Sequence, residues 1–316
     1  MGNAEFDLIS RIRVRLDARA DVLLGIGDDA ALLAVPPGMQ LVVTADTLNA
    51  GVHFPDDTVA ADIGWKSLAV NLSDLAAMGA TPAWCTLSLS LPQADAHWVD
   101  GFLDGFLGLA NLHGIALVGG DTTRGPLSVS ITAMGLVEPG NALRRDGAQP
   151  GDDVWVTGTL GDAAFALCWV LAGHQPSLFS RSRLDRPSPR VDAGLRLRGL
   201  AHACVDLSDG LLADLSHICE RSEVAAEVDL CALPASADLQ SLEPSARWTL
   251  QACGGDDYEL CFTATPRHRQ LIVQAMDFAG VVATRVGRIV AGQGVRALDD
   301  AGIEWQPPQP GYQHFR

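Results

Sequence analysis

The sequence contains a single lysine, Lys66, among its 316 residues, and 38 acidic side chains against 22 basic ones give a formal net charge of −16. Nucleic acids and anionic membrane surfaces are bound mainly by lysine and arginine placed against phosphates. The charge balance therefore argues against either as a partner. A polyphosphate ligand would have to be neutralised here by metal ions and a few arginines.

Several phosphate-binding and hydrolytic motifs are also missing. The P-loop pattern G-x-x-x-x-G-K-[ST] is excluded, because the one lysine has no such context. The glycine-rich loop and D-F-G of protein kinases, the H-E-x-x-H of zinc proteases and the G-x-S-x-G of esterases do not occur either. A phosphotransferase built on this chain would have to work without these devices.

The seven cysteines are odd in number, show no C-x-x-C spacing and lie mostly within apolar runs. They predict reduced, buried thiols rather than zinc ligands or disulfides. No apolar stretch approaches the roughly 20 residues of a membrane helix, and residues 1–19 show no signal-peptide pattern. We therefore expect a cytoplasmic protein.

Length and composition predict two domains. A chain of 316 residues that is 48% apolar can build two cores of about 150 residues each. Residues 139–153 are rich in glycine, proline and charge and show no periodicity, which is typical of a linker. The sequence predicts an N-terminal domain over residues 1–138 and a C-terminal domain over residues 154–316.

The apolar pattern also predicts individual elements. Two short apolar runs, residues 30–35 and 41–44, are separated by Pro-Pro-Gly-Met and predict a β-hairpin. Helical spacing predicts a helix over residues 59–78. A short buried strand over residues 115–118 is expected to feed directly into a Gly-Gly-Asp turn.

Aspartates are grouped beside these apolar runs, and 30 of the 38 acidic residues are aspartate. Carboxylates at the ends of rigid elements can converge on divalent cations, which a polyphosphate substrate needs. The pattern favours a magnesium- and ATP-dependent phosphotransferase, although each motif alone could be a turn or a helix cap, with Ser208 or Asp209 well placed to cap the next helix. The motifs are GIGDD (25–29), TADT (44–47), NLSD (71–74), GGDT (119–122), DLSDG (206–210) and GGDD (254–257).

The order and spacing of these segments resemble the bacterial thiamine-monophosphate kinase family. The resemblance covers residues 5–262 and returns at residues 311–315. It rests on GIGDDAALL, TADTLNAGVHF, WKSLAVNLSDLAAMGATPAW, LVGGDTTRGPLS, LRRDGAQPGD, VTGTLGD, RPSPR, VDLSDGLLADL and CGGDDYELCFT. The wider relatives are the aminoimidazole-ribonucleotide synthetase superfamily, which includes selenophosphate synthetase.

The resemblance implies an α/β (α+β) protein with a two-domain synthetase-like fold. Its N-terminal mixed sheet would form a barrel across a homodimer, and its C-terminal α/β domain would complete the active site. ATP would be the co-substrate, several Mg²⁺ ions the cofactor, and thiamine phosphate the acceptor.

The resemblance also implies site residues. The implied metal ligands are Asp29, Thr44, Asp46, Asp74, Asp121, Asp206 and Asp209. The implied ATP contacts are His113, Gly120, Asp121, Arg145 and Ser208, and the implied substrate contacts are His53, Asp256 and Tyr312. Family members often carry other residues where this chain has Ala45 (a hydroxyl residue), His113 (a tyrosine) and Asp256 (a glutamate).

The expected chemistry needs no catalytic base. A phosphate monoester has its second pKa near 6 and is mostly dianionic at pH 7. We expect direct in-line transfer of the ATP γ-phosphoryl group to thiamine phosphate, supported by Asp46, Asp121 and Arg145, rather than a phospho-enzyme on His53. The alternatives are another synthetase of the superfamily, a metal-dependent phosphohydrolase, or a non-catalytic nucleotide-binding module.

Overall fold

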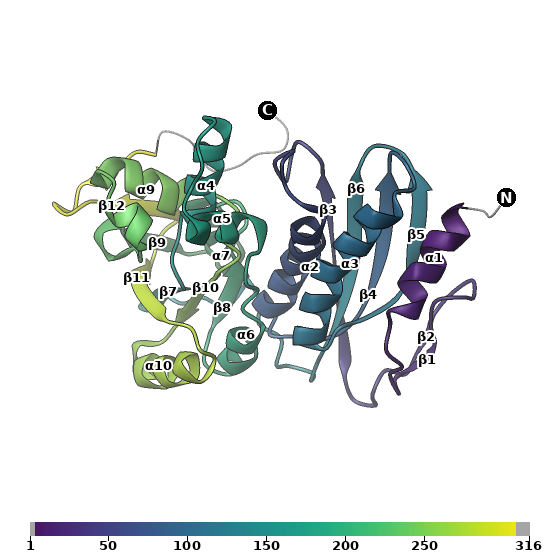
Figure 1. The fold of residues 1–316 in the computed structure, drawn as a ribbon. Helices are drawn as coiled ribbons and strands as arrows, with labels where there is room; N and C mark the ends of the chain where they lie inside the picture. The colour runs from purple at the N-terminus through teal and green to yellow at the C-terminus, as the bar shows by residue number, and fades with distance from the viewer. Residues whose placement is uncertain (1–3, 308–316) are drawn as a thin grey trace. The chain divides into compact units, whose positions relative to one another are not determined.

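The computed structural model describes residues 4–307, so Tyr312 lies outside the described residues. Residues 4–75 and 80–140 form one compact unit (unit 1), and residues 76–79 and 141–307 form a second (unit 2). Both units combine helices with a sheet (Figure 1), which confirms the predicted α/β (α+β) class. Within residues 4–307, no helix is long and apolar enough to cross a membrane.

Unit 1 is built on a four-stranded mixed sheet whose order is β3-β6-β4-β5. Only β4 and β5 pair in parallel, and the other neighbours are antiparallel. Helices α2 and α3 lie against one face of this sheet (Figure 1). The bounds are α1 Ala4–Val14, β1 Val22–Leu24, β2 Leu32–Leu33, β3 Gln40–Asn49, α2 Ala60–Ala77, β4 Thr81–Leu91, α3 Ala96–His113, β5 Ala116–Arg124 and β6 Ser128–Val137.

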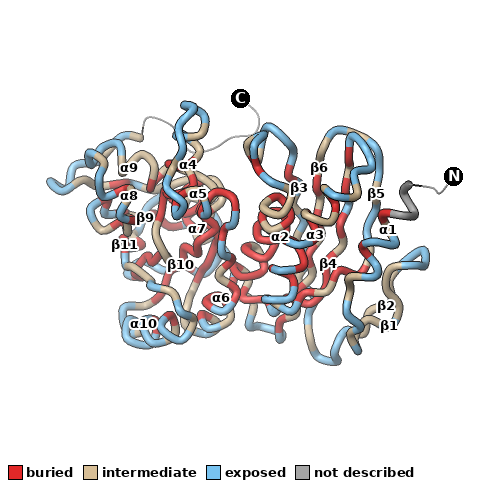
Figure 2. Tube along the Cα trace, viewed as in Figure 1, coloured by how far each residue is buried: buried red, intermediate tan, exposed pale blue. Residues whose placement is uncertain are grey.

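Helices α2 and α3 pack closely because glycines face each other's backbone. A Cβ atom on Gly105 of α3 would lie 1.7 Å from the carbonyl oxygen of Ala61, and one on Gly64 of α2 would lie 2.0 Å from that of Phe102. The buried stretches of α2 and β4 are red in Figure 2. The side of the sheet opposite the helices keeps apolar residues exposed, with Val43 of β3 57% accessible.

Two sequence expectations for unit 1 were wrong. The apolar runs at residues 30–35 and 41–44 do not form a hairpin, because β2 pairs with β1 whereas all ten residues of β3 pair with β6. The strand after α3 does not end at residue 118. It continues to Arg124, because its pairing with β4 runs through the glycines as far as Leu91.

Unit 2 holds a seven-stranded sheet of order β13-β12-β9-β11-β7-β10-β8, in which only β12 and β9 are parallel. The strands are β7 Asp153–Thr157, β8 Ala203–Asp206, β9 Ala225–Asp229, β10 Leu260–Ala264, β11 Ala283–Val290, β12 Gly294–Leu298 and β13 Glu304–Trp305. The helices are α4 Asp162–Leu171, α5 Leu178–Asp185, α6 Val191–Leu197, α7 Leu211–Ser222, α8 Ala237–Gln240, α9 Pro244–Cys253 and α10 Arg269–Phe278, with short 3₁₀ helices at Leu230–Ala232 and Pro266–His268.

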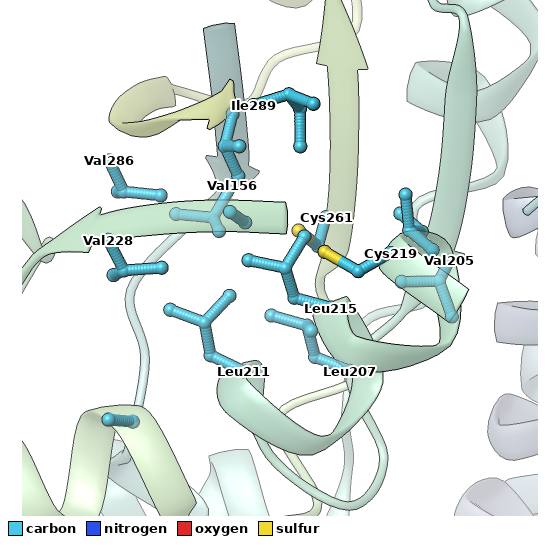
Figure 3. Close-up of a cluster of buried hydrophobic side chains, with 14 of the residues drawn as sticks. Val156, Val205, Leu207, Leu211, Leu215, Cys219, Val228, Cys261, Val286 and Ile289 are labelled. Carbon is cyan, nitrogen blue, oxygen red and sulfur yellow. The ribbon is translucent and has the colours of Figure 1, made fainter. Parts of the chain in front are cut away.

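The core of unit 2 lies between this sheet and α7. Leu211 and Leu215 of α7 point toward Val156 of β7 and Val228 of β9 (Figure 3). The apolar residues of α7 recur at helical spacing, so one face of the helix is buried. The packing fixes the start of α7, and with it the Asp-Leu-Ser-Asp-Gly loop that precedes the helix.

Candidate functional site

Unit 1 contains a pocket of about 830 Å³ between α1, the Gly-Ile-Gly-Asp-Asp loop and strand β5. Its lining includes Asp28, Asp29, Gly120 and Asp121. Gly120 has a φ of +150°, and a Cβ atom there would lie 1.8 Å from the carbonyl oxygen of Leu87. Glycine is therefore required for β5 to run this close to β4. The pocket brings together three of the residues that the sequence assigns to metal or nucleotide.

Arg13 of α1 also lines this pocket. Among the lining residues, all within the described part of the chain, it is the one that carries a positive charge. Its guanidinium lies over Gly27, where a Cβ atom would come within 3.0 Å of Nη1. Sequence reasoning missed Arg13, because nothing in the helix pattern distinguishes it from Arg11 and Arg15, which pair with Asp100 and Asp104.

A second acidic cluster in unit 1 joins β3 to α2. Thr44 Oγ1 donates a hydrogen bond of 2.5 Å to Asp74 Oδ2. Asp46 lies two residues along β3 and so on the same face as Thr44. Burial, followed by the charge of Asp74 and a hydrogen bond with it, raises the pKa of Asp46 to about 6. Two carboxylates held together in this way favour a cation as their neighbour.

The sheet register separates this cluster from Asp121. Asp46 pairs with Ile131, Ile131 with Leu87, and Leu87 with Gly120, so two strands lie between β3 and β5. At a strand spacing of about 4.8 Å this is roughly 14 Å. Asp121 is one residue further along β5, where it pairs with Ser88. The five implied metal residues of unit 1 therefore occupy two places.

The donor chemistry of both places fits Mg²⁺. Among residues 4–307, no three His, Cys, Asp or Glu side chains are grouped closely enough to hold a metal ion unaided. Mg²⁺ characteristically binds one or two carboxylates and completes its shell with water and substrate phosphates. Paired oxygen donors such as Asp46 and Asp74 match this mode, whereas a zinc site would need nitrogen or sulfur ligands.

His53 lies in the loop between β3 and α2. Its backbone N–H donates to the carbonyl oxygen of Asn49 at 3.1 Å, and its ring Nδ1 accepts from the Asn49 N–H at 3.0 Å. Lys66 Nζ donates to the carbonyl oxygen of His53 at 3.1 Å. The loop thus holds both the backbone and the ring of His53.

In unit 2, the residues implied for metal and nucleotide lie in the loop between β8 and α7. The side chain of Asp214, in the first turn of α7, accepts hydrogen bonds of 3.0–3.1 Å from the N–H groups of Ser208, Asp209 and Gly210. The expectation that Ser208 or Asp209 caps the helix was wrong. The N-cap residue is Gly210, and Asp214 supplies the capping carboxylate from inside the helix.

Asp214 is 3% exposed. Burial, together with the charge of Asp209, raises the pKa of Asp214 to about 7, although the three backbone donors act in the other direction. Asp206 ends β8 and is 4% exposed. The loop thus combines a buried carboxylate at its start with an anchored backbone at Ser208 and Asp209.

The Gly-Gly-Asp-Asp turn of unit 2, at residues 254–257, packs directly on this loop. The N–H of Asp256 donates to the carbonyl oxygen of Ser208 at 2.9 Å, and a Cβ atom on Gly255 would lie 2.5 Å from the same oxygen. Asp256 has a φ of +68°, and its carboxylate accepts from the Tyr258 hydroxyl at 3.1 Å. The structure therefore brings Ser208, Asp209 and Asp256 together.

Arg145 is exposed in the segment between β6 and β7, and its backbone is fixed by one side chain. The Ser222 hydroxyl donates to the carbonyl oxygen of Arg145 at 3.1 Å. The same hydroxyl accepts from the N–H groups of Gly147 at 3.1 Å and Ala148 at 3.2 Å.

His113 ends α3 in unit 1 and is not among the residues that line the 830 Å³ pocket.

Sequence reasoning missed a buried ionic network beside the Gly-Gly-Asp-Asp turn. Glu259 is fully buried and pairs with Arg183 at 2.8 Å and Arg190 at 2.5 Å, and it accepts from the Thr157 hydroxyl at 2.6 Å. Burial opposes its charge, but the bonds and charges of Arg190 and Arg183 outweigh this and lower the pKa of Glu259. The available signal was a glutamate directly before the apolar run that forms β10.

Comparison with known proteins identifies the class. The chain belongs to the AIR synthase related proteins, whose N-terminal domain model matches residues 27–137 and whose C-terminal domain model matches residues 149–300. It is 45% identical over 329 aligned residues to the thiamine-monophosphate kinase of Escherichia coli (strain K12), an alignment that covers 100% of this chain and 99% of that protein. Within the class, the chain belongs to the thiamine-monophosphate kinase family, which confirms the resemblance found in the motifs.

Solved structures agree with this assignment. The thiamine-monophosphate kinase of Stenotrophomonas maltophilia K279a is 59% identical, with a TM-score of 0.88 over 94% of this chain and 97% of that one. A structure of AaThiL complexed with AMPPCP and TMP is 32% identical, with a TM-score of 0.78 over 98% and 97% of the two chains.

Proposed function

We propose that this chain transfers the γ-phosphoryl group of ATP to thiamine phosphate, giving thiamine diphosphate and ADP. The observation that carries the proposal is the full-length similarity to AaThiL, which was solved with AMPPCP and TMP. AMPPCP is a non-hydrolysable analogue of ATP. TMP, in a thiamine-monophosphate kinase, is the phosphate-bearing acceptor. The same two ligands fit a chain whose acidic loops are suited to metal-bound polyphosphate.

The proposed cofactor is Mg²⁺, which would neutralise the phosphate charge that this lysine-poor chain cannot. Asp29 and Asp121 line one pocket of unit 1, and Thr44, Asp46 and Asp74 form its second oxygen cluster. Asp206 and Asp209 belong to the anchored loop of unit 2. These seven residues are the proposed metal ligands.

The remaining proposed contacts hold the two substrates. ATP contacts are assigned to His113, Gly120, Asp121, Arg145 and Ser208, and thiamine-phosphate contacts to His53, Asp256 and Tyr312. The fixed positions of His53 and Asp256 support their assignment as substrate contacts. The ring of His53 accepts a hydrogen bond from the Asn49 N–H, and the N–H of Asp256 donates to the Ser208 carbonyl oxygen. We propose direct transfer, with Asp46, Asp121 and Arg145 as its supports, since the acceptor oxygen is already anionic and needs no base.

We also propose that the protein acts as a homodimer. The face of the unit 1 sheet away from α2 and α3 leaves Leu41 45% and Val43 57% exposed on neighbouring positions of one strand. Half-exposed apolar rows on a regular sheet are costly in water and suit contact with a second copy. A β-barrel built across the dimer is the geometry that the resemblance implies.

The proposed domain division is residues 1–138 and 154–316 joined by a linker at 139–153. The separate matches of the two domain models, which end at residue 137 and begin at residue 149, support it. We propose a cytoplasmic location, supported by seven cysteines that are all free.

The experiment that tests the function is acceptor-dependent ADP formation with Mg²⁺. We expect thiamine phosphate to stimulate it, whereas selenide and formylglycinamidine ribonucleotide should not. Stimulation by either of the latter would favour another synthetase of the superfamily. Phosphate release without any acceptor would indicate a phosphohydrolase, and binding of ATP without turnover would indicate a non-catalytic module.

A further inference from the structure

The one lysine of the chain is buried. Lys66 lies in α2 and is 1% exposed, and its Nζ atom donates to the backbone carbonyl of His53, 13 residues earlier, at 3.1 Å. Lysine is almost never fully buried without a partner, because removing an ammonium group from water is costly. A buried charge aimed at a loop carbonyl therefore indicates that the position of this loop matters.

The loop that Lys66 contacts is anchored at several points. The N–H of Ala50 donates to the carbonyl oxygen of Leu127 at 3.2 Å, and the Phe54 side chain is buried with 5% exposed. Between these anchors, His53 receives the Lys66 ammonium on its carbonyl oxygen and the Asn49 N–H on its ring. Its backbone and side chain are thus fixed by different partners.

The Asn49 contact also decides which ring nitrogen of His53 carries hydrogen. A nitrogen that accepts a hydrogen bond from a backbone N–H cannot itself be protonated, so the neutral ring carries its hydrogen on Nε2. In this tautomer Nε2 is a donor, which suits a phosphate oxygen. Because Nε2 carries the hydrogen, it is not a nucleophile, so the Asn49 contact also disfavours a phospho-histidine at Nε2.

We propose that Lys66 is a positioning residue that holds the His53 loop so that His53 donates its Nε2–H to the phosphate of the acceptor. This inference rests on the proposed function, since it takes His53 as an acceptor contact. Lys66 supplies a strong, charge-assisted bond to the carbonyl, and Asn49 then orients the ring. Without the ammonium, the carbonyl would lose its charge-assisted donor, and the loop would be held less firmly.

The kinetic test replaces Lys66 by methionine, which keeps the length and removes the donor. We expect Lys66→Met to raise the KM for thiamine phosphate about tenfold, as for one lost hydrogen bond, and to leave the KM for ATP within about twofold. Ser67→Ala is the matched control, because Ser67 is equally buried on α2 and its hydroxyl donates to the carbonyl oxygen of Gly64 within the same helix. It should change neither constant.

Two further variants separate positioning from loss of fold. Lys66→Gln retains a donor and should recover part of the lost affinity for thiamine phosphate. In the double variant His53→Ala, Lys66→Met, the second change should add nothing to the first, because Lys66 acts through His53. The proposal would be overturned if the effects of His53→Ala and Lys66→Met on the KM for thiamine phosphate multiplied in the double variant. It would also be overturned if Lys66→Met raised the KM for ATP as much as that for thiamine phosphate.

A spectroscopic readout keeps the inference separate from the function. In the parent protein, ¹⁵N NMR of the His53 ring should show a bare Nδ1 and a protonated Nε2, and Lys66→Met should give a mixture of tautomers. An unchanged spectrum in Lys66→Met would overturn the role of Lys66 whatever the enzyme does. A changed spectrum in a protein that does not phosphorylate thiamine phosphate would support the positioning role and refute the proposed function.

Discussion

Thr44 on β3 and Asp74 on α2 are joined by a hydrogen bond of 2.5 Å between Oγ1 and Oδ2. The contact ties the edge strand of the unit 1 sheet to the helix that covers it, and it brings Asp74 to the neighbouring Asp46. Because each carboxylate disfavours the charge of the other, the pair is unfavourable without a cation and favourable with one.

The first prediction concerns this pair. At pH 8 and without divalent cations, Asp74→Asn should stabilise the protein by roughly 1 kcal/mol, or about 2–3 °C in Tm, because it removes the repulsion from Asp46. Folding raises the pKa of Asp46 to about 6, so protonation of Asp46 stabilises the folded protein at low pH. This contribution to the free energy of unfolding is lost as the pH rises from about 4 to 6. The gain from Asp74→Asn should therefore shrink below pH 6.

Thermal melts with and without Mg²⁺ check this prediction. Mg²⁺ should raise the Tm of the parent and should raise that of Asp74→Asn by much less. Asp56→Asn removes an exposed carboxylate from the loop before α2 and is the control. Equal responses of Asp74→Asn and Asp56→Asn to Mg²⁺ would show that Asp74 is not a ligand.

The second prediction concerns Arg13 in the 830 Å³ pocket. Arg13→Ala should raise the KM for ATP about three- to tenfold, since it removes the positive charge from the pocket lining. Arg11→Ala, on the same helix but paired with Asp100, is the matched control and should change it little. Steady-state kinetics at varied ATP measures both. If the two variants had the same KM for ATP, Arg13 would not be an ATP contact.

Some of the fold and site could be predicted because the signals are local. The helix over residues 59–78 followed from apolar spacing, and α2 spans Ala60–Ala77. The pairing of β3 could not be predicted, since its partner β6 lies about 90 residues away and the Pro-Pro-Gly-Met turn suggested a nearer one. The sequence motifs picked out Asp46 and Asp74, whose proximity depends on how α2 packs on the sheet.

The ionic network in unit 2 was not predictable for a similar reason. Glu259 is 76 residues from Arg183 and 69 from Arg190, so no local spacing links them. The cap of α7 was assigned wrongly because Asp214 reaches back from inside the helix, whereas capping residues usually precede it. Asp214 could be seen in the sequence, but the sequence did not show that its side chain turns back toward the N-terminus of the helix.

The third prediction concerns the stability of this network. Glu259→Gln should destabilise the protein by about 3 kcal/mol at pH 7, because Arg183 and Arg190 lose a buried partner. Because folding lowers the pKa of Glu259, its ionised side chain stabilises the folded protein fully at pH values above 4.5, the ordinary pKa of glutamate. This stabilisation is lost as the pH falls through the lower pKa of the folded state. The difference between parent and variant should therefore narrow under acid conditions.

Urea unfolding at pH 7 and at pH 4 measures this difference. Glu227→Gln is the matched control, because Glu227 also pairs with two arginines, Arg288 and Arg296, but at the surface of β9. It should cost less than about 1 kcal/mol. If both glutamines cost the same, burial does not set the strength of the Glu259 network.

The fourth prediction concerns the hydroxyl of Ser222, which fixes the backbone around Arg145. Ser222→Ala leaves the N–H groups of Gly147 and Ala148 without their acceptor, so the Arg145 segment should move and the KM for ATP should rise about threefold. Ser216→Ala is the control, since Ser216 lies on the same helix and bonds only locally to Ala213. A KM unaffected by Ser222→Ala would mean that Arg145 needs no such anchor or does not contact ATP.

The most direct test of the proposed activity and of its metal ligands is a chromatographic assay for thiamine diphosphate after incubation with thiamine phosphate, ATP and Mg²⁺, run on the parent and on Asp74→Asn and Asp121→Asn. We expect Mg²⁺-dependent product from the parent and a loss of at least about 100-fold in rate in each variant, as for removal of transition-state charge stabilisation. Full activity in both variants, or no thiamine diphosphate from the parent, would contradict the proposal.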